Sequence, residues 1–318
     1  MKKFVIIDGH HLIFRAFYAI QNLTTREGFP SNAIFGFASM ILNILALENP
    51  DYFAIAFDSG KTFRHEEHKG YKGTRKERPK ELDIQIPQIY EMVEKMNIPY
   101  FMAEGYEADD VLGTLATLCL SDKNIKTIIV TGDKDLLQMV NENIIVAFPH
   151  KGGKEPVYMD EMAILEKYNI TPSQIPDFKG MSGDISDNIK GVQGLGPKGA
   201  TKLLNDFKTL EGIYENLDKI KGITKTKLEN SREEAFFAKY LATIITNVPT
   251  DFSLEKTKFC GLSNKVLPFF EKMNFNSLQK RITPFFQNKN KEFSLEENKN
   301  NKEGLSYDGC QNDQLSLF

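Results

Sequence analysis

Cysteine, long apolar runs and a one-sided charge are all scarce in this chain of 318 residues. The three cysteines are far apart and odd in number, so they indicate neither a disulfide framework nor a zinc site, and they fit a reducing compartment. The net charge of −3 and the pI of about 6.0 do not by themselves indicate a nucleic-acid-binding protein. Any contact with nucleic acid must therefore depend on local basic patches.

The apolar runs of the sequence are too short to cross a membrane. The longest, residues 33–47, is interrupted by Gly36, Ser39 and Asn43 and falls short of the roughly 20 residues that a spanning helix needs. The apolar run at the N-terminus is too short for a signal peptide and leads directly into a predicted strand. We therefore expect a cytoplasmic protein without a membrane partner.

Strand-like and helix-like segments alternate in the first half of the chain. Strands are predicted near residues 3–8, 52–58, 98–102, 126–131 and 144–148. Helices are predicted near residues 10–20, 33–48, 82–97, 107–121 and 134–140. This alternation predicts an α/β core over residues 1–160, with a mostly parallel sheet between layers of helices. Short helices separated by turns predict a helical region packed on that sheet over residues 161–286.

The composition changes after residue 286, where Asn, Lys and Glu become abundant. Such a segment cannot bury enough apolar surface to offset its ordering entropy, so we expect a disordered tail over residues 287–318. Apolar side chains return in the last five residues, Gln314-Leu315-Ser316-Leu317-Phe318. This ending is either a binding peptide on a flexible tether or an incidental apolar end.

Nine acidic residues in five short groups are the main chemical signal of the sequence. They are Asp8, Asp58, Glu107, Asp109, Asp110, Asp133, Asp135, Asp184 and Asp187. At least three groups follow a predicted strand, and sites in open parallel sheets form at the carboxyl ends of strands. So many carboxylates share a pocket only if cations neutralise them or some bind protons. Because oxygen ligands favour Mg²⁺ or Mn²⁺, the pattern predicts two divalent cations and metal-dependent phosphate chemistry.

Each acidic group also has a simpler interpretation when it is considered alone. Residues 107–110 stand at the start of a predicted helix, where acidic side chains complement the helix dipole. Asp133 and Asp135 fit a turn followed by a helix cap, and residues 183–188 fit an ordinary turn. The joint occurrence of all five groups is much less expected by chance and favours the metal site.

A basic segment follows Asp58. Residues 60–80 contain eight Lys or Arg against three Glu, which gives a local charge of +5. The segment is either a solvated surface loop or an element that grips phosphates, and its closeness to a proposed metal ligand favours the second. Lys72 and Arg75 are the candidates for stabilising charge on a phosphate. Tyr71 beside Lys72 suits base stacking.

A glycine-rich run contains a formal dinucleotide-binding motif at Gly194, Gly196 and Gly199. We reject that interpretation because no strand precedes the run and no βαβ unit with an acidic residue about 20 residues further on follows it. A turn between two helices fits better, because Pro197 suits the first turn of a helix. Backbone N–H groups there suit a phosphate, and Lys198 adds charge. The carbonyl groups suit K⁺, and a plain connector is the alternative.

Together these motifs resemble the 5′-nuclease, or flap endonuclease, family, and most closely the nuclease domain at the N-terminus of bacterial DNA polymerase I. The matching stretches occur in the family's order and cover roughly residues 1–285. They are residues 5–9, 56–58, 61–64, 70–72, 105–110, 131–138, 180–188 and 194–198.

The resemblance implies a resolvase-like or PIN-like core, a helical arch near residues 60–95 and a helix–three-turn–helix element near residues 185–207. It implies that the nine acidic residues hold two Mg²⁺, for which Mn²⁺ would substitute. It also implies that Lys72 and Arg75 assist catalysis and that Tyr71 stacks on a displaced base. DNA contacts are expected from Arg64, Tyr71, Gly194, Gly196, Lys198 and Gly199.

The activity implied by the resemblance is structure-specific 5′–3′ exonuclease and flap-endonuclease cleavage of DNA during primer removal and repair. We expect a monomer that works near the nucleoid and, because no polymerase segment follows, a stand-alone nuclease. Two alternatives remain open. A DNA-binding protein without catalysis is disfavoured by the complete acidic set. A metal-dependent ribonuclease of the same α/β type is disfavoured by Lys72, the basic segment and the glycine-rich turn.

The last five residues resemble the peptide by which bacterial replication proteins bind the β sliding clamp. The resemblance implies that Leu315, Leu317 and Phe318 fill hydrophobic pockets while Gln314 forms hydrogen bonds at their rim. A flexible tether to the clamp would raise the local concentration of the nuclease at its DNA.

Overall fold

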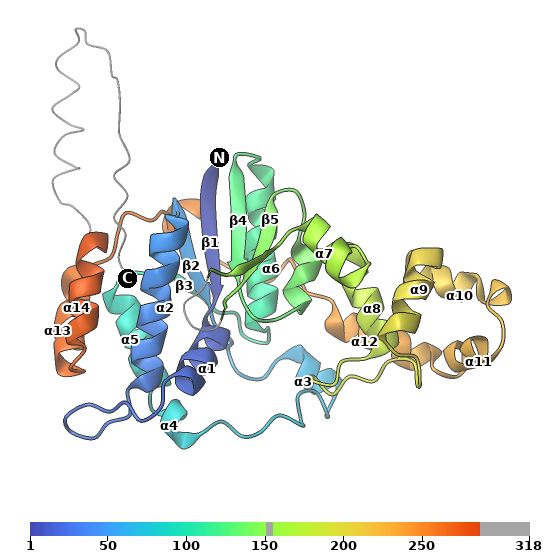
Figure 1. The fold of residues 1–318 in the computed structure, drawn as a ribbon, viewed down its shortest axis with the longest axis horizontal. Helices are drawn as coiled ribbons and strands as arrows, with labels where there is room; N and C mark the ends of the chain where they lie inside the picture. Colours follow the sequence, from blue (N-terminus) through green and yellow to red (C-terminus); the bar gives the residue numbers. More distant parts are fainter. Residues whose placement is uncertain (151–154, 287–318) are drawn as a thin grey trace, which may run out of the picture.

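The computed structural model describes residues 1–150 and 155–286, and Figure 1 shows its ribbon. Within these residues a six-stranded sheet has the order β3-β2-β1-β4-β5-β6. The strands are β1 (Lys2–Asp8), β2 (Tyr52–Ala56), β3 (Tyr100–Phe101), β4 (Ile125–Val130), β5 (Ile144–Phe148) and β6 (Val157–Met159). The first five are parallel to their neighbours, and β6 is antiparallel to β5. The mostly parallel sheet predicted from the sequence is confirmed.

Helices cover both faces of the sheet. On one face lie α1 (Gly9–Ala19), α2 (Asn32–Glu48), α5 (Ile86–Lys95), α13 (Leu267–Lys272) and α14 (Asn276–Ile282), and on the other lies α6 (Ala108–Leu118). The side chains of β1 alternate between two cores, as a strand requires. Val5 and Ile7 pack with α1 and α2, whereas Phe4 and Ile6 pack with α6. The continuous apolar run of β1 is therefore typical of a parallel strand buried on both faces.

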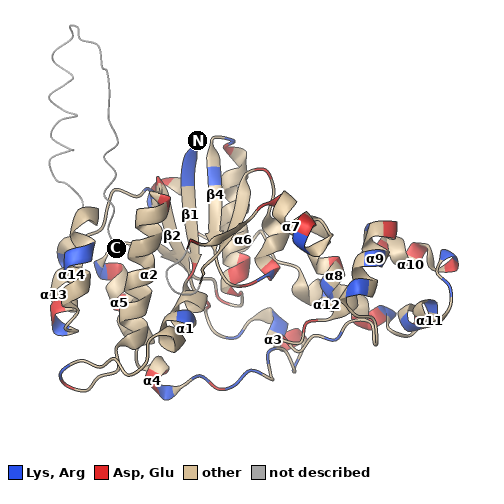
Figure 2. Cartoon of the chain, viewed as in Figure 1, with Lys and Arg blue, Asp and Glu red and all other residues tan. Residues whose placement is uncertain are grey.

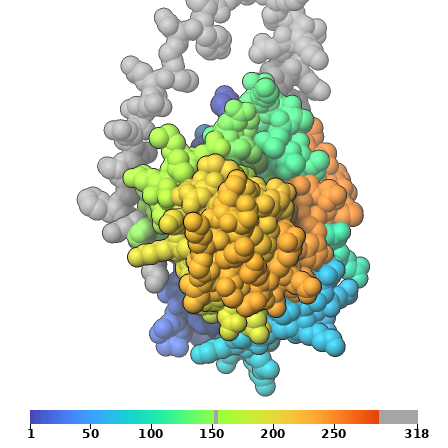
Figure 3. All heavy atoms as spheres, turned by 90° about the vertical axis from the view of Figure 1, so that its right-hand side faces the viewer, coloured from blue at the N-terminus to red at the C-terminus, as the bar shows by residue number. Residues whose placement is uncertain are grey.

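The helical region extends the second core away from the sheet. It consists of α7 (Glu161–Tyr168), α8 (Ile175–Ser182), α9 (Pro197–Phe207), α10 (Leu210–Glu215), α11 (Ile223–Asn230) and α12 (Arg232–Ala242). Met181, Leu204 and Leu228 are buried in the same apolar cluster as Phe4 and Ile6 of the sheet. Figure 3 looks onto the end of this region, with its yellow and orange atoms in front and most of the blue and cyan atoms below them. The helical region is thus packed on the sheet, as the sequence predicted.

Two segments differ from the sequence expectation. Between Asp58 and α5 the described chain has two short helices, α3 (Phe63–Glu67) and α4 (Lys80–Asp83), joined by turns and extended residues rather than a helical arch. This stretch has too few apolar side chains to bury a helix face. The helix α5, predicted as part of the arch, buries Ile89 and Met92 against the sheet. Likewise, α13 and α14 pack beside α2 rather than in the helical region.

Neither described range contains a helix that is both long and apolar enough to cross a membrane. The predicted tail and its last five residues lie outside the described part of the chain.

Candidate metal centre

The carboxyl ends of β1, β2 and β4 meet at one edge of the sheet and bring three predicted acidic residues together. Asp8 ends β1 and accepts a hydrogen bond of 2.8 Å from the hydroxyl of Thr131. That hydroxyl in turn accepts a 3.0 Å hydrogen bond from the backbone N–H of Asp133, which follows β4. Asp58 follows β2 and accepts a 2.7 Å hydrogen bond from the N–H of Ala108, at the start of α6. The parallel topology therefore gathers these carboxylates.

A close approach at Gly9 keeps this edge compact. A Cβ atom at Gly9 would lie 2.2 Å from the ring of Phe57, at the end of β2. The absence of a side chain lets α1 begin directly after Asp8 while Phe57 fills the space beside it. Glycine is therefore required at position 9, directly after Asp8, where β1 ends and α1 begins.

The carboxylates of Asp8 and Asp109 lie among other negative charges. Burial, followed by the charges of Asp58 and Asp133, raises the pKa of Asp8 to about 7. Burial and the charges of Asp133 and Asp8 also raise the pKa of Asp109 well above its ordinary value of 3.8. Nearby Lys72 offsets only part of this negative charge, and divalent cations would supply the rest. Asp8, Asp58, Glu107, Asp109 and Asp133 are called the first acidic group here. Their carboxylate oxygens are donors that suit a divalent metal ion.

These pKa shifts predict that metal binding releases protons. Below pH 7 the folded protein holds a proton on Asp8, and a cation bound there must displace it. We expect about one proton released per protein at pH 6, and stronger Mn²⁺ binding as the pH rises to 8. Calorimetric titrations in buffers of different ionisation enthalpy measure this release. Binding at pH 6 without proton release would contradict the assigned charges.

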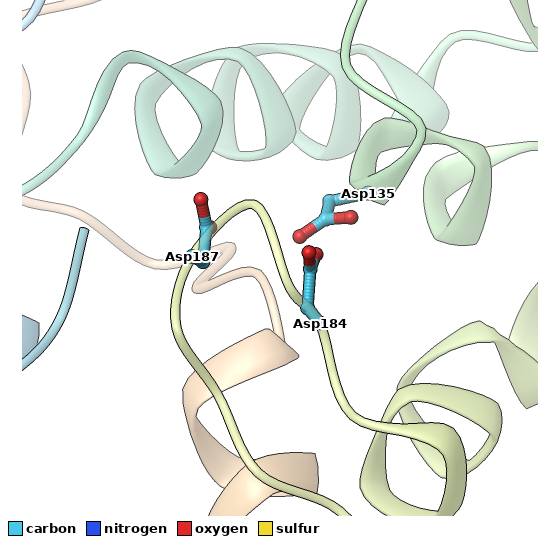
Figure 4. Close-up of side chains that lie close together, drawn as sticks. All are labelled: Asp135, Asp184 and Asp187. Atoms are coloured by element: carbon cyan, nitrogen blue, oxygen red, sulfur yellow. The ribbon is translucent and has the colours of Figure 1, made fainter. Parts of the chain in front are cut away.

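The second acidic group lies beside the first, around the loop that follows α8. One carboxylate oxygen from each of Asp135, Asp184 and Asp187 lies within 4.8 Å of the others. Figure 4 shows Asp135 and Asp184 facing one another, with Asp187 beside them on the same loop as Asp184. Protein cations already contact these oxygens. Lys179 contacts Asp135 and Asp184, and Arg75 donates a 2.6 Å hydrogen bond to Asp187.

The charge balance of the second group differs from that of the first. Burial alone would raise the pKa of Asp184, but the nearby Lys179 ammonium and hydrogen bonds from Ser186 lower it to about 2. The loop is shaped by Gly183, whose φ of +71° suits glycine and whose missing side chain leaves room for Gly191. Asp184 is therefore ionised, and the Lys179 ammonium compensates its charge.

The two basic residues predicted to assist catalysis, Lys72 and Arg75, lie between the first and second acidic groups. Lys72 donates from Nζ to Glu107 at 2.6 Å and from its backbone N–H to the carbonyl of Asp187 at 3.0 Å. Burial opposes its charge, but the carboxylates of Glu107 and Asp187 raise the pKa of Lys72. Its φ of +53° is unusual for a residue with a side chain, and the bond to Asp187 holds that conformation. Lys72 is thus a positioned, permanently charged group.

A cleft of about 380 Å³ opens beside these groups. Its walls include the cations Lys72, Arg75 and Arg78, the carboxylates Asp58 and Glu107, and the rings of His10, Phe14 and Tyr90. Lys72, Arg75 and Arg78 belong to the segment between α3 and α4. Figure 2 shows further Lys and Arg residues spaced along this segment. Mixed cationic and aromatic walls suit a strand that presents phosphates and bases. The sequence did not single out His10, Phe14, Arg78 or Tyr90.

Arg64 and Asp110 have a different role from the one predicted. Arg64 is only 3% exposed, so it is not placed to contact DNA, and its guanidinium makes hydrogen bonds of 2.6 and 2.8 Å to the two oxygens of Asp110. Asp110 is fully buried and also accepts a hydrogen bond from the N–H of Ile245. With both oxygens engaged, Asp110 acts here as half of an internal ion pair rather than as a direct metal ligand.

Tyr71 also differs from the sequence prediction. It is 5% exposed, and its hydroxyl lies 3.0 Å from Glu107 and 3.3 Å from Asp187. A ring buried in this way has no free face for a displaced base. Tyr71 instead joins the basic segment to carboxylates of both acidic groups.

The glycine-rich turn precedes α9 as the sequence predicted. Gly194 has a φ of +73°, and Gly196 is the residue before the first turn of α9, which begins at Pro197. Lys198 is exposed in that first turn, whereas Gly199 packs closely on Leu195. The carbonyl of Gly194 accepts a 2.7 Å hydrogen bond from Lys227. The turn therefore combines a positively polarised helix start with exposed lysine.

Carboxylates gathered at a strand edge beside a cationic cleft suit the class of metal-dependent α/β nucleases. Family models support this class directly. Residues 3–169 match the 5′-3′ exonuclease N-terminal resolvase-like domain, and residues 170–265 match the 5′-3′ exonuclease C-terminal SAM fold. The chain belongs to the 5′-3′ exonuclease family.

Curated relatives and solved structures agree with the family. The chain is 44% identical over 257 residues to DNA polymerase I of Caldicellulosiruptor bescii, covering 80% of this chain and 30% of that protein. It is 40% identical over 266 residues to DNA polymerase I of Bacillus subtilis, covering 83% of this chain and 30% of that protein. The chain thus spans less than a third of the length of these polymerases.

Two solved structures share the fold. The T5 5′-exonuclease with bound divalent metal ions (zinc) aligns with a TM-score of 0.62 at 23% identity, covering 77% of this chain and 90% of that one. The catalytic core of Rad2 in complex with DNA substrate aligns with a TM-score of 0.61 at 18% identity, covering 90% and 92% of the two chains. At these identities the likeness establishes the fold.

Proposed function

We propose that this chain is a structure-specific 5′–3′ exonuclease and flap endonuclease that hydrolyses DNA with the help of two divalent cations. The observation that carries the proposal is the meeting of two acidic groups beside a cleft lined by Lys72, Arg75 and Arg78. Membership of the 5′-3′ exonuclease family and similarity to DNA polymerase I support this activity.

The carboxylates divide into two proposed metal sites. Asp8, Asp58, Glu107, Asp109 and Asp133 would hold one cation, and Asp135, Asp184 and Asp187 the other, with Asp110 supporting the first through Arg64. All these donors are oxygens, so Mg²⁺ is the natural occupant and Mn²⁺ its substitute. Cations held there by these carboxylates would lower the pKa of an attacking water and neutralise charge on the phosphate.

The residues of the chain position the DNA strand for this reaction. Lys72 and Arg75 line the cleft while they contact Glu107 and Asp187, so a phosphate entering the cleft meets both cations at once. These fixed charges would stabilise the negative charge that grows on the phosphate during hydrolysis. Their place between the two acidic groups also aligns the strand with both proposed metal sites.

The glycine-rich turn is proposed to hold the duplex outside the cleft. Gly194, Gly196 and Gly199 let the backbone approach a phosphate closely, and Lys198 adds a salt-dependent contact. A K⁺ ion at this turn would use carbonyl oxygens beyond that of Gly194, which Lys227 already contacts. The enzyme would act as a monomer in the cytoplasm, close to the nucleoid, in primer removal and repair.

Cleavage of a labelled 5′ flap tests the proposed function. With Mg²⁺ we expect products cut near the flap junction together with short products from the 5′ end, and none in EDTA. Tight binding without cleavage would support a DNA-binding protein instead. Faster cleavage of single-stranded RNA than of the flap would support the ribonuclease alternative.

The last five residues are proposed to bind the β sliding clamp through Gln314, Leu315, Leu317 and Phe318, on the strength of their sequence. Deleting residues 314–318 should remove clamp association and leave flap cleavage without the clamp unchanged, because the proposed metal sites lie within residues 8–187. A pull-down with purified clamp measures the first effect and a flap assay the second. Equal clamp recovery with and without the peptide would refute this proposal.

A further inference from the structure

Lys179 lies between two carboxylates of the second acidic group. Its Nζ is 2.5 Å from Asp184 Oδ2 and also contacts Asp135 Oδ1, and its side chain is 14% exposed. The two acids come from different elements, since Asp135 begins the 3₁₀ helix after β4 and Asp184 lies in the loop after α8. The ammonium of Lys179 is therefore an internal cation placed where carboxylate oxygens from two elements converge.

The negative charge of Asp187, the third carboxylate of the second acidic group, is also compensated by a basic side chain of the protein. Asp187 pairs with Arg75, so each of the three carboxylates contacts a basic side chain. The first acidic group differs, because Glu107 pairs with Lys72 and Arg64, whereas Asp8, Asp109 and Asp133 form no salt bridge within the described residues. The two proposed metal sites are thus unequal before any metal binds.

We propose that Lys179 competes with the second divalent cation for Asp135 and Asp184 and so sets the affinity of that site. The inference rests on the proposed function, because it assumes that the second group takes a cation. Mg²⁺ binds carboxylate oxygens at about 2.0–2.1 Å, which an ammonium on the same oxygens would obstruct by contact and by repulsion. The flexible four-carbon stem of lysine lets the ammonium move away while α8 stays in place.

Competition of this kind has a specific consequence for metal use. The first site should fill at low metal concentration, and the second only when the metal displaces Lys179. Lys179 is accordingly a positioning and selectivity residue that acts on the metal. Its effect should be visible in metal binding without DNA and without turnover.

The test compares two lysines that each bridge a pair of carboxylates. Lys239, on α12, contacts Asp177 and Glu211 at 2.7 Å each and serves as the matched control for Lys179. Methionine keeps an unbranched side chain of similar length and removes the charge. Mn²⁺ binding to the full chain without DNA is measured by calorimetry and by the electron paramagnetic resonance of free Mn²⁺.

We expect Lys179→Met to tighten the weaker Mn²⁺ site by a factor of about ten or more, the scale on which one nearby charge shifts an ionisation equilibrium. Lys239→Met should leave the Mn²⁺ isotherm unchanged. Unchanged or weaker Mn²⁺ binding by Lys179→Met would overturn the proposal. If that variant fails to fold, Lys179→Gln gives the same decision.

A further variant separates failure of this inference from failure of the proposed function. Asp135→Asn should abolish the weaker Mn²⁺ site, because it removes a proposed ligand. If it does so while Lys179→Met changes nothing, the metal site stands and the competition is refuted. If wild-type protein binds no second Mn²⁺, both the competition and the two-metal proposal are refuted.

Discussion

Asp133→Asn should lower the rate of flap cleavage by more than about a hundredfold, beyond the 10–100-fold typical of residues that only orient a metal ligand. The charge of Asp133 acts on Asp8, Asp109 and Arg75, so it reaches both acidic groups. Asparagine keeps the size of the side chain and can still accept the 2.9 Å hydrogen bond from the N–H of Asp135. DNA affinity should therefore remain close to that of the wild type.

The same substitution should stabilise the protein when metal is absent. Removing one negative charge relieves the repulsion that raises the pKa values of Asp8 and Asp109. Thermal unfolding in EDTA at pH 7.5 should thus give a higher Tm for the variant, and added Mn²⁺ should stabilise the wild type more. Asp160→Asn, at the start of α7, is the control that also keeps a backbone hydrogen bond. Near-normal cleavage by Asp133→Asn would refute its assignment as a ligand.

Lys72→Ala should slow the chemical step by about 10²–10³, the usual effect of removing one fixed charge or donor that stabilises a transition state. The Lys72 ammonium lines the cleft, 2.6 Å from Glu107, and its backbone is held by Asp187. Single-turnover rates at saturating enzyme report the chemical step, and equilibrium binding of the same flap in Ca²⁺ reports affinity. We expect the rate to fall much more than the affinity.

Lys167→Ala is a matched control for this experiment. Each lysine lies over the ring of a tyrosine next to it in the sequence. Lys72 is 5.0 Å from the ring centroid of Tyr71, and Lys167 is 5.5 Å from that of Tyr168. Lys167 is an exposed residue of α7 and does not line the cleft, so its loss should leave the cleavage rate unchanged. A Lys72 variant that loses affinity alone would show that this residue only holds the DNA.

The sheet could be predicted from the sequence because its parallel strands are short runs of apolar, largely β-branched residues. In β1 and β4 both faces are buried, so the runs are nearly continuous and easy to recognise. The edge strand β6 was missed because it has three residues, of which Val157 and Tyr158 are exposed. The arch was expected to be helical by resemblance, but its basic residues and glycines form turns instead.

The acidic groups could be predicted because three of them follow strands. Parallel strands end at the same edge of the sheet, so residues that follow them lie close together. The ion pairs that hold the site could not. Arg64 and Asp110 are 46 residues apart, and Lys179 and Asp135 are 44 apart, so no local pattern marks them as partners. The burial of Tyr71 was missed for the same reason, because its partners Glu107 and Asp187 come from other elements.

We propose that strand ends and a loop distant in sequence together supply the carboxylates of two cation sites. Anomalous scattering from crystals grown with Mn²⁺ tests it most directly. We expect two manganese peaks, one among Asp8, Asp109 and Asp133 and the other beside Asp135 and Asp184. Well-ordered carboxylates without a manganese peak between them, at a concentration that supports flap cleavage, would contradict it.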